Sequence, residues 1–323
     1  MSAVVDSPGM TLLRVTRAEP AAEGIRLFEL RDPQGGELPA FDSGAHISVK
    51  VPSGALRKYS LCNDPAERDR YIIAVKRETT GQGGSASMID RTSVGDPIYV
   101  SPPRNDFALK ENRVGYIFIA GGIGITPILS MVRHLRAAGG AKFKLYYLSR
   151  SPETTAFLDE LSGPQFRGQV KIHHDYGDPA QSLDLWPILE QSKGAHLYCC
   201  GPRPLMQSVR DMTGHWSPVA VHFESFVDGS ATHKPDDRAF AVRLARSAER
   251  IEVPADVSIL DAVRGQGHTV PSSCESGTCG TCKTKLISGD VDHRDLVLSD
   301  AERADHIMLC VSRARSGDLV IDL

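Results

Sequence analysis

Four cysteines near the C-terminal end constrain this chain more than any other feature. Three of them follow the spacing C-x4-C-x2-C, and the fourth comes after a gap of 27 residues: Cys274, Cys279, Cys282 and Cys310. This spacing is typical of the ligands of a plant-type [2Fe–2S] cluster. Gly277 and Gly280 lie among the ligands, where glycine lets the backbone wrap closely and point N–H groups at the cluster sulfurs. The loop therefore predicts an iron–sulfur centre.

Zinc is the alternative metal, because a structural zinc site also uses four thiolates. Zinc modules favour two paired C-x2-4-C hooks, however, rather than a tight triplet and one distant ligand. The chain has seven cysteines, an odd number that suits a metal centre in a reducing compartment better than a disulfide framework. The spacing favours the cluster over zinc.

Length and composition indicate a multidomain globular protein. The chain has 323 residues, of which 41% are hydrophobic and 24% charged, so that two or three domains are expected and a mainly disordered chain is excluded. The net charge is −3, and residues 239–323 carry the whole excess, with 10 Lys and Arg against 13 Asp and Glu. No block of basic residues suggests a nucleic-acid partner.

The sequence also contains no apolar run of the roughly 18 residues that a membrane span requires. Its first residues, MSAVVDSPGM, lack the features of a secretory signal. We therefore expect a cytoplasmic protein with no membrane partner, and a monomer.

The pattern of residue types changes twice along the chain. Residues 12–100 hold short β-type runs such as HISVKV and YIIAVKR, which predict an antiparallel sheet or barrel. YIFIAG, KLYYLSR, VKIHHD and HLYCC then alternate with helical stretches, a pattern typical of a parallel α/β sheet. The polar segment VDGSATHKPDDR is the best linker candidate. We predict a β-barrel domain at 1–108, an α/β nucleotide-binding domain at 109–228, a linker at 229–238 and an α+β, β-grasp-like domain at 239–323.

Two short motifs in the first domain suit a phosphorylated, planar, redox-active ring. The first, Arg57-Lys58-Tyr59-Ser60, combines a cation for phosphate with an aromatic ring and a hydroxyl. The second, Gly81-Gln82-Gly83-Gly84-Ser85, is a glycine-rich turn that leads into a helix, where N–H groups favour phosphate. Each motif alone is also compatible with ordinary packing or loop structure.

Two glycine turns in the second domain predict a nucleotide crevice. Residues 121–127, GGIGITP, follow an apolar strand and open a helix, so that the backbone can approach a pyrophosphate. Cys200-Gly201-Pro202 follows a later strand of the same predicted sheet. Both turns lie at the carboxyl edge of a parallel sheet, which is where such sheets bind ligands.

Together these strings carry a family resemblance. The segments RKYSLCND, GGIGITP, YCCGP and HFESF resemble the ferredoxin reductase superfamily over residues 1 to about 228, and PSSCESGTCGTC resembles the plant-type ferredoxins over the remaining tail. The resemblance implies FMN, NADH and a [2Fe–2S] cluster as cofactors. It further implies electron transfer from NADH through FMN and the cluster to a Rieske-type terminal oxygenase.

The resemblance also implies roles for individual residues. Those near FMN would be Arg57, Lys58, Tyr59, Ser60, Val75, Lys76, Gly83, Gly84, Ser85, Glu224 and Phe226, with the ring of Phe226 stacked on the flavin. Those near NADH would be Gly121, Gly122, Gly124, Thr126, Pro127, Asp175, Cys200, Gly201 and Pro202. Among them, Ser60, Thr126, Cys200 and Phe226 would lie at the reacting rings. Gln82 departs from the family, which often has Arg there.

Several other residues are interpreted either as functional or as structural. Asp175 would accept a hydrogen bond from the adenine ribose and repel a 2′-phosphate, whereas Ser149-Arg150 is a possible 2′-phosphate pair. Cys62 and Cys199 are interpreted as packed thiols. The run Asp292-His293-Arg294-Asp295 is interpreted as a solvated face. Two other functions remain open: a stand-alone NADH:flavin reductase, and a zinc-bearing interaction module.

Overall fold

The computed structural model describes residues 9–79, 83–139, 141–226 and 234–323. The chain divides into two compact units, Met1–Pro202 and Arg203–Leu323.

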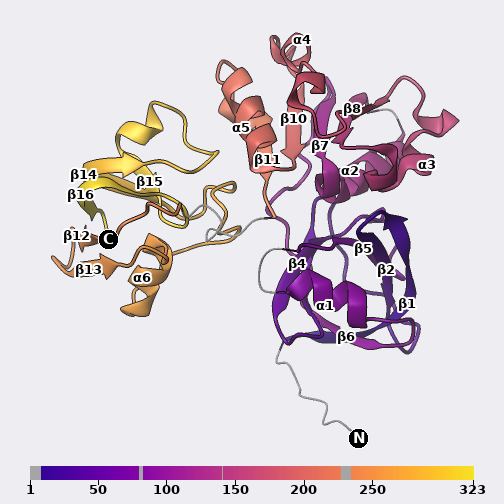
Figure 1. Ribbon diagram of the computed structural model, residues 1–323, viewed down its shortest axis with the longest axis horizontal. Helices are drawn as coiled ribbons and strands as arrows, with labels where there is room; N and C mark the ends of the chain where they lie inside the picture. The colour runs from indigo at the N-terminus through magenta and orange to yellow at the C-terminus, as the bar shows by residue number, and fades with distance from the viewer. Residues whose placement is uncertain (1–8, 80–82, 140, 227–233) are drawn as a thin grey trace, which may run out of the picture. The chain divides into compact units, whose positions relative to one another are not determined.

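The first unit begins with a six-stranded antiparallel sheet (Figure 1). Its strand order is β4-β3-β6-β1-β2-β5. The strands are β1 (Thr11–Ala22), β2 (Ile25–Arg31), β3 (His46–Lys50), β4 (Leu56–Ser60), β5 (Tyr71–Lys76) and β6 (Pro97–Val100). Helix α1 (Gly84–Arg91) lies between β5 and β6 in the chain.

One hydrophobic core takes side chains from this whole sheet. Leu13, Phe28, Ile47, Ile73 and Ile98 come from five different strands, and all are buried in the same cluster. Tyr59 of the remaining strand, β4, packs against this cluster. A sheet whose strands all face one core is strongly curled, as expected for a barrel-type domain.

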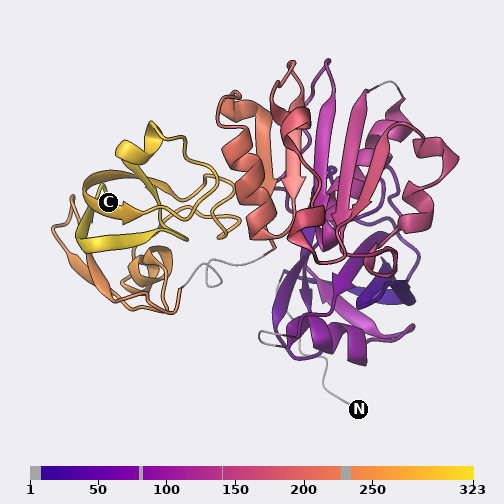
Figure 2. The ribbon, with the colours of Figure 1, turned by 45° about the horizontal axis from the view of Figure 1, so that its top comes forward.

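A parallel sheet makes up the rest of the first unit, and Figure 2 shows its strands side by side. Four strands of this sheet lie in this unit: β7 (Tyr116–Gly121), β8 (Phe143–Ser149), β9 (Val170–His174) and β10 (His196–Cys200), adjacent in the order β10-β7-β8-β9. The connecting helices are η1 (Gly122–Gly124), α2 (Ile125–Ala138), η2 (Pro152–Thr154), α3 (Leu158–Leu161), η3 (Pro164–Phe166), η4 (Pro179–Gln181) and α4 (Trp186–Leu189).

Helix α2 forms because apolar residues recur at helical spacing along its sequence. Ile125, Ile128, Leu129 and Val132 are fully buried against the sheet. The helix ends at Gly139, which has a left-handed φ of 66° that glycine adopts readily.

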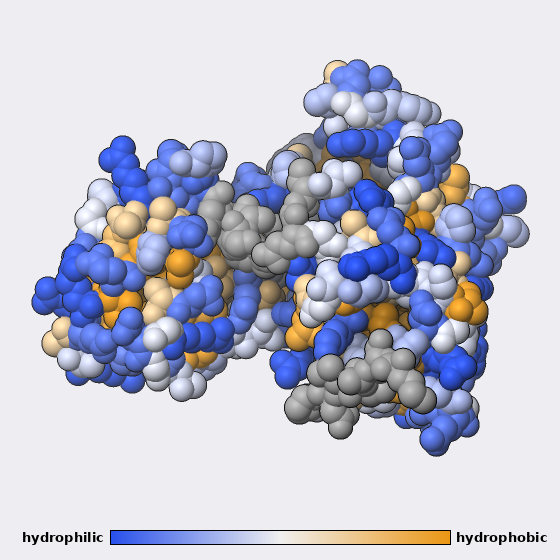
Figure 3. Space-filling view, turned by 60° about the horizontal axis from the view of Figure 1, so that its bottom comes forward, coloured by the Kyte–Doolittle hydropathy of each residue, from blue (hydrophilic) through white to orange (hydrophobic). Residues whose placement is uncertain are grey.

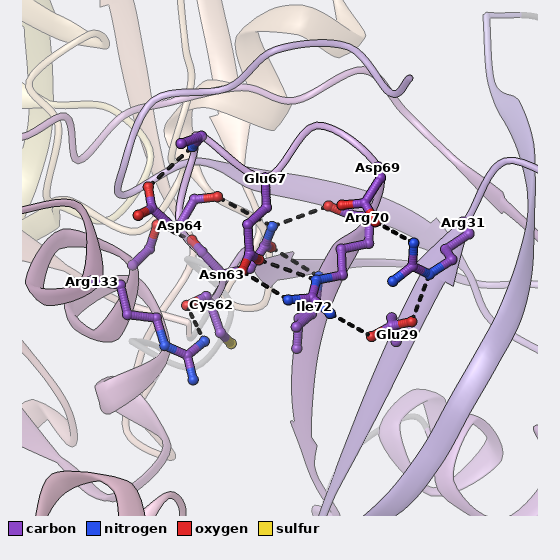
Figure 4. A network of polar contacts seen from close by, with 12 residues as sticks. Glu29, Arg31, Cys62, Asn63, Asp64, Glu67, Asp69, Arg70, Ile72 and Arg133 are labelled. Atoms are coloured by element: carbon purple, nitrogen blue, oxygen red, sulfur yellow. Dashed lines mark hydrogen bonds and ion pairs between the residues drawn. The ribbon is translucent and has the colours of Figure 1, made fainter. Parts of the chain in front are cut away.

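A polar network joins α2 to the segment that follows β4 (Figure 4). Ser130 Oγ donates to the carbonyl of Asn63 at 2.8 Å, and Arg133 Nη1 donates to the carbonyl of Cys62 at 2.9 Å. The fully buried Asn63 in turn accepts the N–H of Ile72 on its side-chain oxygen at 3.0 Å. Arg133 is fixed from its other side by Glu160. The two sheets of this unit are therefore tied together by buried hydrogen bonds.

The second unit contains a mixed five-stranded sheet and helix α6 (Ile259–Gly265) (Figure 1). The strand order is β13-β12-β16-β14-β15, with β12 parallel to β16 and the other pairs antiparallel. The strands are β12 (Phe240–Leu244), β13 (Arg250–Val253), β14 (Lys283–Asp292), β15 (His306–Met308) and β16 (Arg313–Ile321). The unit also includes α5 (Arg203–Met212), η5 (Pro218–Ala220), β11 (Val221–Glu224) and η7 (Glu302–Ala304).

Buried ion pairs hold the start of this C-terminal domain. The carboxylate of Asp237 accepts from Arg294 Nη1 at 2.7 Å and lies 3.5 Å from Arg313 Nε, and all three side chains are at most 7% exposed. Arg313 also donates to three backbone carbonyls, those of residues 238, 254 and 257. Residues 229–233 of the predicted linker lie outside the described part of the chain. Near the C-terminal end of the linker, these ion pairs hold Asp237 in place.

This arrangement corrects one expectation. Arg294 is 6% exposed and Asp295 is 2% exposed, so the prediction of a solvated face at residues 292–295 was wrong. Arg294 is buried because Asp237 and Asp292 both pair with it. A charged tetrapeptide in a sequence does not show whether partners from other segments neutralise it.

The predicted fold class is confirmed by the antiparallel sheet, the parallel sheet and the C-terminal domain. Cys62 and Cys199 are fully buried, as predicted. Hydrophilic residues predominate on the face drawn in Figure 3, and hydrophobic ones form small patches. Within the described part of the chain, no helix has the length and apolar character that crossing a membrane requires.

The Asp237 ion pairs lead to a stability prediction. We expect Asp237→Asn to destabilise the C-terminal domain by about 3–5 kcal/mol, because it removes the carboxylate that pairs with buried Arg313 and leaves buried Arg294 with Asp292 alone. Hydrogen bonds from Arg294 lower the pKa of Asp237 to about 2. The stabilisation should therefore be complete above pH 4 or so, near the unfolded pKa of about 3.9, and disappear as the pH falls through 2.

Urea unfolding followed by circular dichroism between pH 2 and 7 measures this effect. Asp236→Asn is the matched control, since Asp236 is the exposed neighbour. Equal stability of the two variants at pH 7 would contradict the role of the ion pairs.

Candidate functional site

The end of strand β4 places two polar groups in a buried position without partners. Tyr59 Oη and Ser60 Oγ are both buried, and neither has a hydrogen-bond partner among the described residues. Burial raises the pKa of Tyr59 to about 12, so its hydroxyl keeps its proton and can donate. Buried polar atoms are nearly always paired in native proteins. These two groups therefore fit a ligand with polar ring atoms, such as a flavin.

The first turn of α1 lies against the same strand. A Cβ added to Gly84 would come within 2.6 Å of Nε of Arg57, so only glycine allows this approach of guanidinium and helix. The N-cap residue Gly83 provides no side-chain cap. A cation beside an uncapped helix start suits a phosphate group. Ser85 Oγ accepts the N–H of Glu78 at 3.0 Å, which fixes the turn from the other side.

The positions of the other residues predicted near FMN do not by themselves indicate a flavin site. Val75 is buried in the core of the antiparallel sheet. Lys58 is exposed, and exposed Lys76 pairs with Glu78 at 3.1 Å. Residues 81 and 82 of the glycine-rich turn lie outside the described residues.

The two predicted glycine turns of the nucleotide domain meet at the carboxyl edge of the parallel sheet. Strands β7 and β10 are adjacent and parallel, and Ala120 pairs with Cys200. A Cβ on Gly124 would come within 2.1 Å of the carbonyl oxygen of Cys200. Gly121 and Gly122 lie in the same turn, at the end of β7. Glycine is therefore required at position 124, where the turn after β7 packs against the end of β10.

Side chains in these turns have structural partners as well. Thr126 is 2% exposed and its Oγ1 donates to the carbonyl of Ile123 at 3.0 Å, which closes the turn. Pro127 is buried in the first turn of α2, and Gly201 and Pro202 directly follow β10. The thiol of Cys200 belongs to the hydrophobic core.

Asp175 follows β9 at the same sheet edge. Its Oδ1 accepts the N–H of Gly177 at 2.8 Å, and the residue is half-buried. Ser149, at the end of β8, is buried, and its Oγ is 2.6 Å from Oγ1 of Thr155. The Ser149 hydroxyl is thus engaged inside the protein, which weakens the alternative of a 2′-phosphate pair.

Tyr176 is a residue at this edge that the sequence analysis missed. Its side chain is 66% exposed although it is aromatic, and its backbone has a left-handed φ of 51°. Its N–H donates to the carbonyl of Arg150 at 2.8 Å, so the turns after β8 and β9 are joined. The signal was the sequence DYGD, a turn directly after a predicted strand.

Glu224 and Phe226 belong to the second unit. Glu224 ends β11, and Phe226 is 44% exposed, an unusual state for a phenylalanine. Their contact with the flavin stays a prediction.

Strand pairing brings two of the four predicted metal ligands, Cys282 and Cys310, together. Cys282 directly precedes β14 and Cys310 follows β15, and these strands are antiparallel with Lys283 opposite Met308. The thiols of Cys282 and Cys310 interact, and so do those of Cys274 and Cys279. Among the described residues no group of three or more metal-binding side chains is gathered around a single point. Two thiol pairs fit a cluster of two irons better than one tetrahedral zinc.

Backbone N–H groups point at these sulfurs, as predicted. Those of Ser276 and Thr278 donate to Cys274 Sγ at 3.4 and 3.5 Å, and that of Cys274 donates to Cys279 Sγ at 3.5 Å. The Cys279 thiol and then these neighbours lower the pKa of Cys274. The loop is therefore preorganised to stabilise thiolate charge.

Glu275 has a specific role in the shape of the ligand loop. Its backbone has a left-handed φ of 55°, which is uncommon for a residue with a side chain. Its Oε1 accepts from Arg264 Nη1 at 2.9 Å and from Ser272 Oγ at 2.6 Å. These two bonds hold the loop in its turn.

Comparison with known proteins agrees with this geometry. Residues 118–211 match the oxidoreductase NAD-binding domain family, and residues 242–315 match the 2Fe-2S iron-sulfur cluster binding domain family. The second match includes all four cysteines, which decides between the cluster and zinc in favour of the cluster.

Full-length relatives cover the rest of the chain. The phthalate 4,5-dioxygenase oxygenase reductase subunit of Pseudomonas putida is 56% identical over 98% of this chain and 97% of its own. The phthalate dioxygenase reductase of Burkholderia cepacia is 55% identical, with 98% of both chains covered. A solved structure of a phthalate dioxygenase reductase, described as modular for electron transfer from pyridine nucleotides to [2Fe–2S], has 55% identity, 98% coverage of both chains and a TM-score of 0.71. The chain therefore belongs to the phthalate dioxygenase reductase family, as an oxidoreductase that uses FMN, NADH and a [2Fe–2S] cluster to transfer electrons from the pyridine nucleotide to the iron–sulfur centre.

Proposed function

We propose that this reductase delivers its electrons to the Rieske centre of a terminal oxygenase that acts on phthalate or a closely related aromatic acid. The observation that carries the proposal is the presence in one chain of the flavin cradle, the nucleotide crevice and two paired sets of thiols. The relatives support it, because one of them is named as the reductase subunit of phthalate 4,5-dioxygenase. We further propose a monomer located in the cytoplasm.

In the flavin cradle, this chain supplies binding and orientation. Tyr59 Oη and Ser60 Oγ would donate to polar atoms of the ring, and Arg57 would hold the phosphate beside the first turn of α1. Bound FMN supplies the conversion between two-electron and one-electron chemistry, and the cluster supplies one-electron storage.

In the nucleotide crevice, backbone groups would make most of the contacts with the nucleotide. The Gly121–Gly124 turn would receive the pyrophosphate, and its contact with the Cys200 carbonyl fixes the position of the crevice. Asp175 would accept the hydroxyl groups of the adenine ribose. Phe226 would cover the flavin until the nicotinamide replaces it.

The Rieske acceptor is proposed on energetic grounds. Rieske centres have potentials from about −150 mV upward, against roughly −400 mV for plant-type clusters. That difference corresponds to about four decades in the equilibrium constant, at ~59 mV each. Electron transfer in this direction is therefore favourable.

The proposal is tested by reconstituting the purified protein with a phthalate-oxygenase component. NADH should reduce the Rieske centre, followed by its visible absorbance, only when the reductase is present. Extracted flavin and acid-labile sulfide should be found at one FMN and two sulfides per chain. Failure to reduce any Rieske oxygenase while dye reduction is normal would overturn the choice of partner.

We expect Cys279→Ser to abolish the cluster and leave NADH-driven reduction of a two-electron dye largely intact. The reason is that the flavin cradle lies in the first unit and the ligand loop in the second. Absorbance spectra and dye turnover measure the two effects. Cys199→Ala, which removes a buried thiol that is not a ligand, should keep both properties. Loss of dye reduction in a flavin-loaded Cys279→Ser protein would contradict the proposed electron order.

We expect Asp175→Asn to reduce the preference for NADH over NADPH by about fivefold to tenfold. Asparagine keeps the acceptor for the Gly177 N–H but no longer repels a 2′-phosphate, and tenfold corresponds to about 1.4 kcal/mol. Stopped-flow flavin reduction with each nucleotide gives the ratio. Asp178→Asn removes a charge from the same loop and should leave it unchanged. If both variants behave alike, the ribose contact is assigned wrongly.

We expect Glu275→Lys to change the salt dependence of oxygenase-coupled turnover, with dye turnover almost unchanged. Glu275 lies between Cys274 and Ser276 in the ligand loop, and a charge at the rim of a docking face mainly affects association rate. Glu252→Lys is the control, since β13 is at the opposite edge of the sheet from β15. Absorbance checks that the cluster is retained. Identical salt curves for wild type and Glu275→Lys would remove this residue from the docking surface.

A further inference from the structure

The turn that follows β14 packs Asp295, a buried residue, against the ligand loop. A Cβ on Gly277 would lie 3.2 Å from Cα and 3.4 Å from Cβ of Asp295, so glycine is required for the approach. The N–H of Leu296 donates to the carbonyl of Gly277 at 2.9 Å. Gly277 lies between the ligands Cys274 and Cys279. Asp295 is therefore a direct neighbour of the segment that holds half of the cluster ligands.

The two oxygens of this carboxylate have different surroundings. Oδ2 accepts the N–H groups of Val297 and Leu298 at 3.1 and 2.8 Å, which closes the turn. Oδ1 is buried and has no hydrogen-bond partner among the described residues. Its nearest basic atom, Nδ1 of His293, is 3.7 Å away, which is beyond hydrogen-bond length. One oxygen thus has a structural role and the other has none in the protein alone.

The carboxyl group is ionised in this position. The side chain is completely inaccessible to solvent, and burial alone would raise its pKa. The nearby His293 imidazole, the Leu298 N–H and the guanidinium of Arg303, 3.9 Å from Oδ2, outweigh burial and lower the pKa of Asp295. The result is a fixed negative charge in a region of low dielectric, where charges act over several ångströms with little screening.

We propose that Asp295 is a positioning and potential-setting residue of the iron–sulfur centre, whose negative charge lowers the reduction potential of the cluster. The added electron makes the cluster more negative, and a buried anion behind the ligand loop disfavours that change. The loop N–H groups act in the opposite direction, because they favour negative charge on the sulfurs. The potential is then set by the balance between these donors and the Asp295 carboxylate, and a lower potential increases the driving force toward the acceptor.

Spectroelectrochemical titration of the full chain, with the cluster signal followed by electron paramagnetic resonance, tests this inference. Asp295→Asn keeps a side-chain oxygen for the two N–H groups and removes the charge. We expect it to increase the equilibrium constant for cluster reduction by about tenfold, a rise of ~59 mV for one electron. The spectral line shape should stay that of wild type, because the ligands are unchanged.

Asp300→Asn is the control, with the same change of charge on a side chain that is 98% exposed five residues away. It should change the equilibrium constant by less than about twofold. If Asp295→Asn and Asp300→Asn give the same potential as wild type, the inference is overturned. It is likewise overturned if Asp295→Asn changes the line shape and the cluster content but not the potential, since the role would then be structural only.

A second variant keeps the test valid if Asp295→Asn does not assemble the cluster. Arg303→Gln removes the guanidinium that partly compensates Asp295, so the potential should fall rather than rise. An unchanged potential in Arg303→Gln would overturn the inference. The inference depends on the iron–sulfur centre but not on the proposed partner, since no oxygenase is present in these titrations.

Discussion

The hydrogen bonds from helix α2 to the segment after β4 are the constraint on which the redox site depends. Ser130 and Arg133 bind the carbonyls of Asn63 and Cys62, which come three and two residues after Ser60, respectively. The same helix begins directly after Gly124. One rigid element thus connects the flavin strand with the nucleotide turn, and hydride transfer requires that two rings meet within contact distance. Because Asn63 and Ser130 are fully buried, water cannot replace these bonds.

The cluster site depends on a different kind of constraint, namely strand register. Cys282 and Cys310 meet because β14 and β15 pair with Lys283 opposite Met308. A shift of one residue would turn one of the two thiols to the other face of the sheet. The tight triplet needs only local turns, whereas the fourth ligand needs the folded domain. Metal binding and folding of this domain are therefore coupled.

Buried charge is the third recurring element, and it is concentrated in the C-terminal domain. Asp237, Arg294 and Arg313 form a compensated group that fixes the point at which the chain enters the domain. Asp295, one residue after Arg294, is only partly compensated and packs against the ligand loop. Adjacent residues thus have different consequences: the paired Arg294 stabilises the domain, and Asp295 places a partly compensated negative charge beside the ligand loop.

The sequence by itself determined the features that depend on local pattern. Short β-type runs predicted the antiparallel strands, strand-like runs that alternate with helical stretches predicted the parallel ones, and the cysteine spacing predicted the cluster, because each signal is carried by residues close together in the chain. The tertiary structure decided what depends on residues far apart. Only the fold shows that Gly84 receives the Arg57 guanidinium, that Thr155 engages the Ser149 hydroxyl and that Arg294 and Asp295 are buried. Charge burial cannot be inferred from a charged run, since it requires partners from segments 57 residues away, as for Asp237 and Arg294, and a sequence pattern does not show which segments will meet.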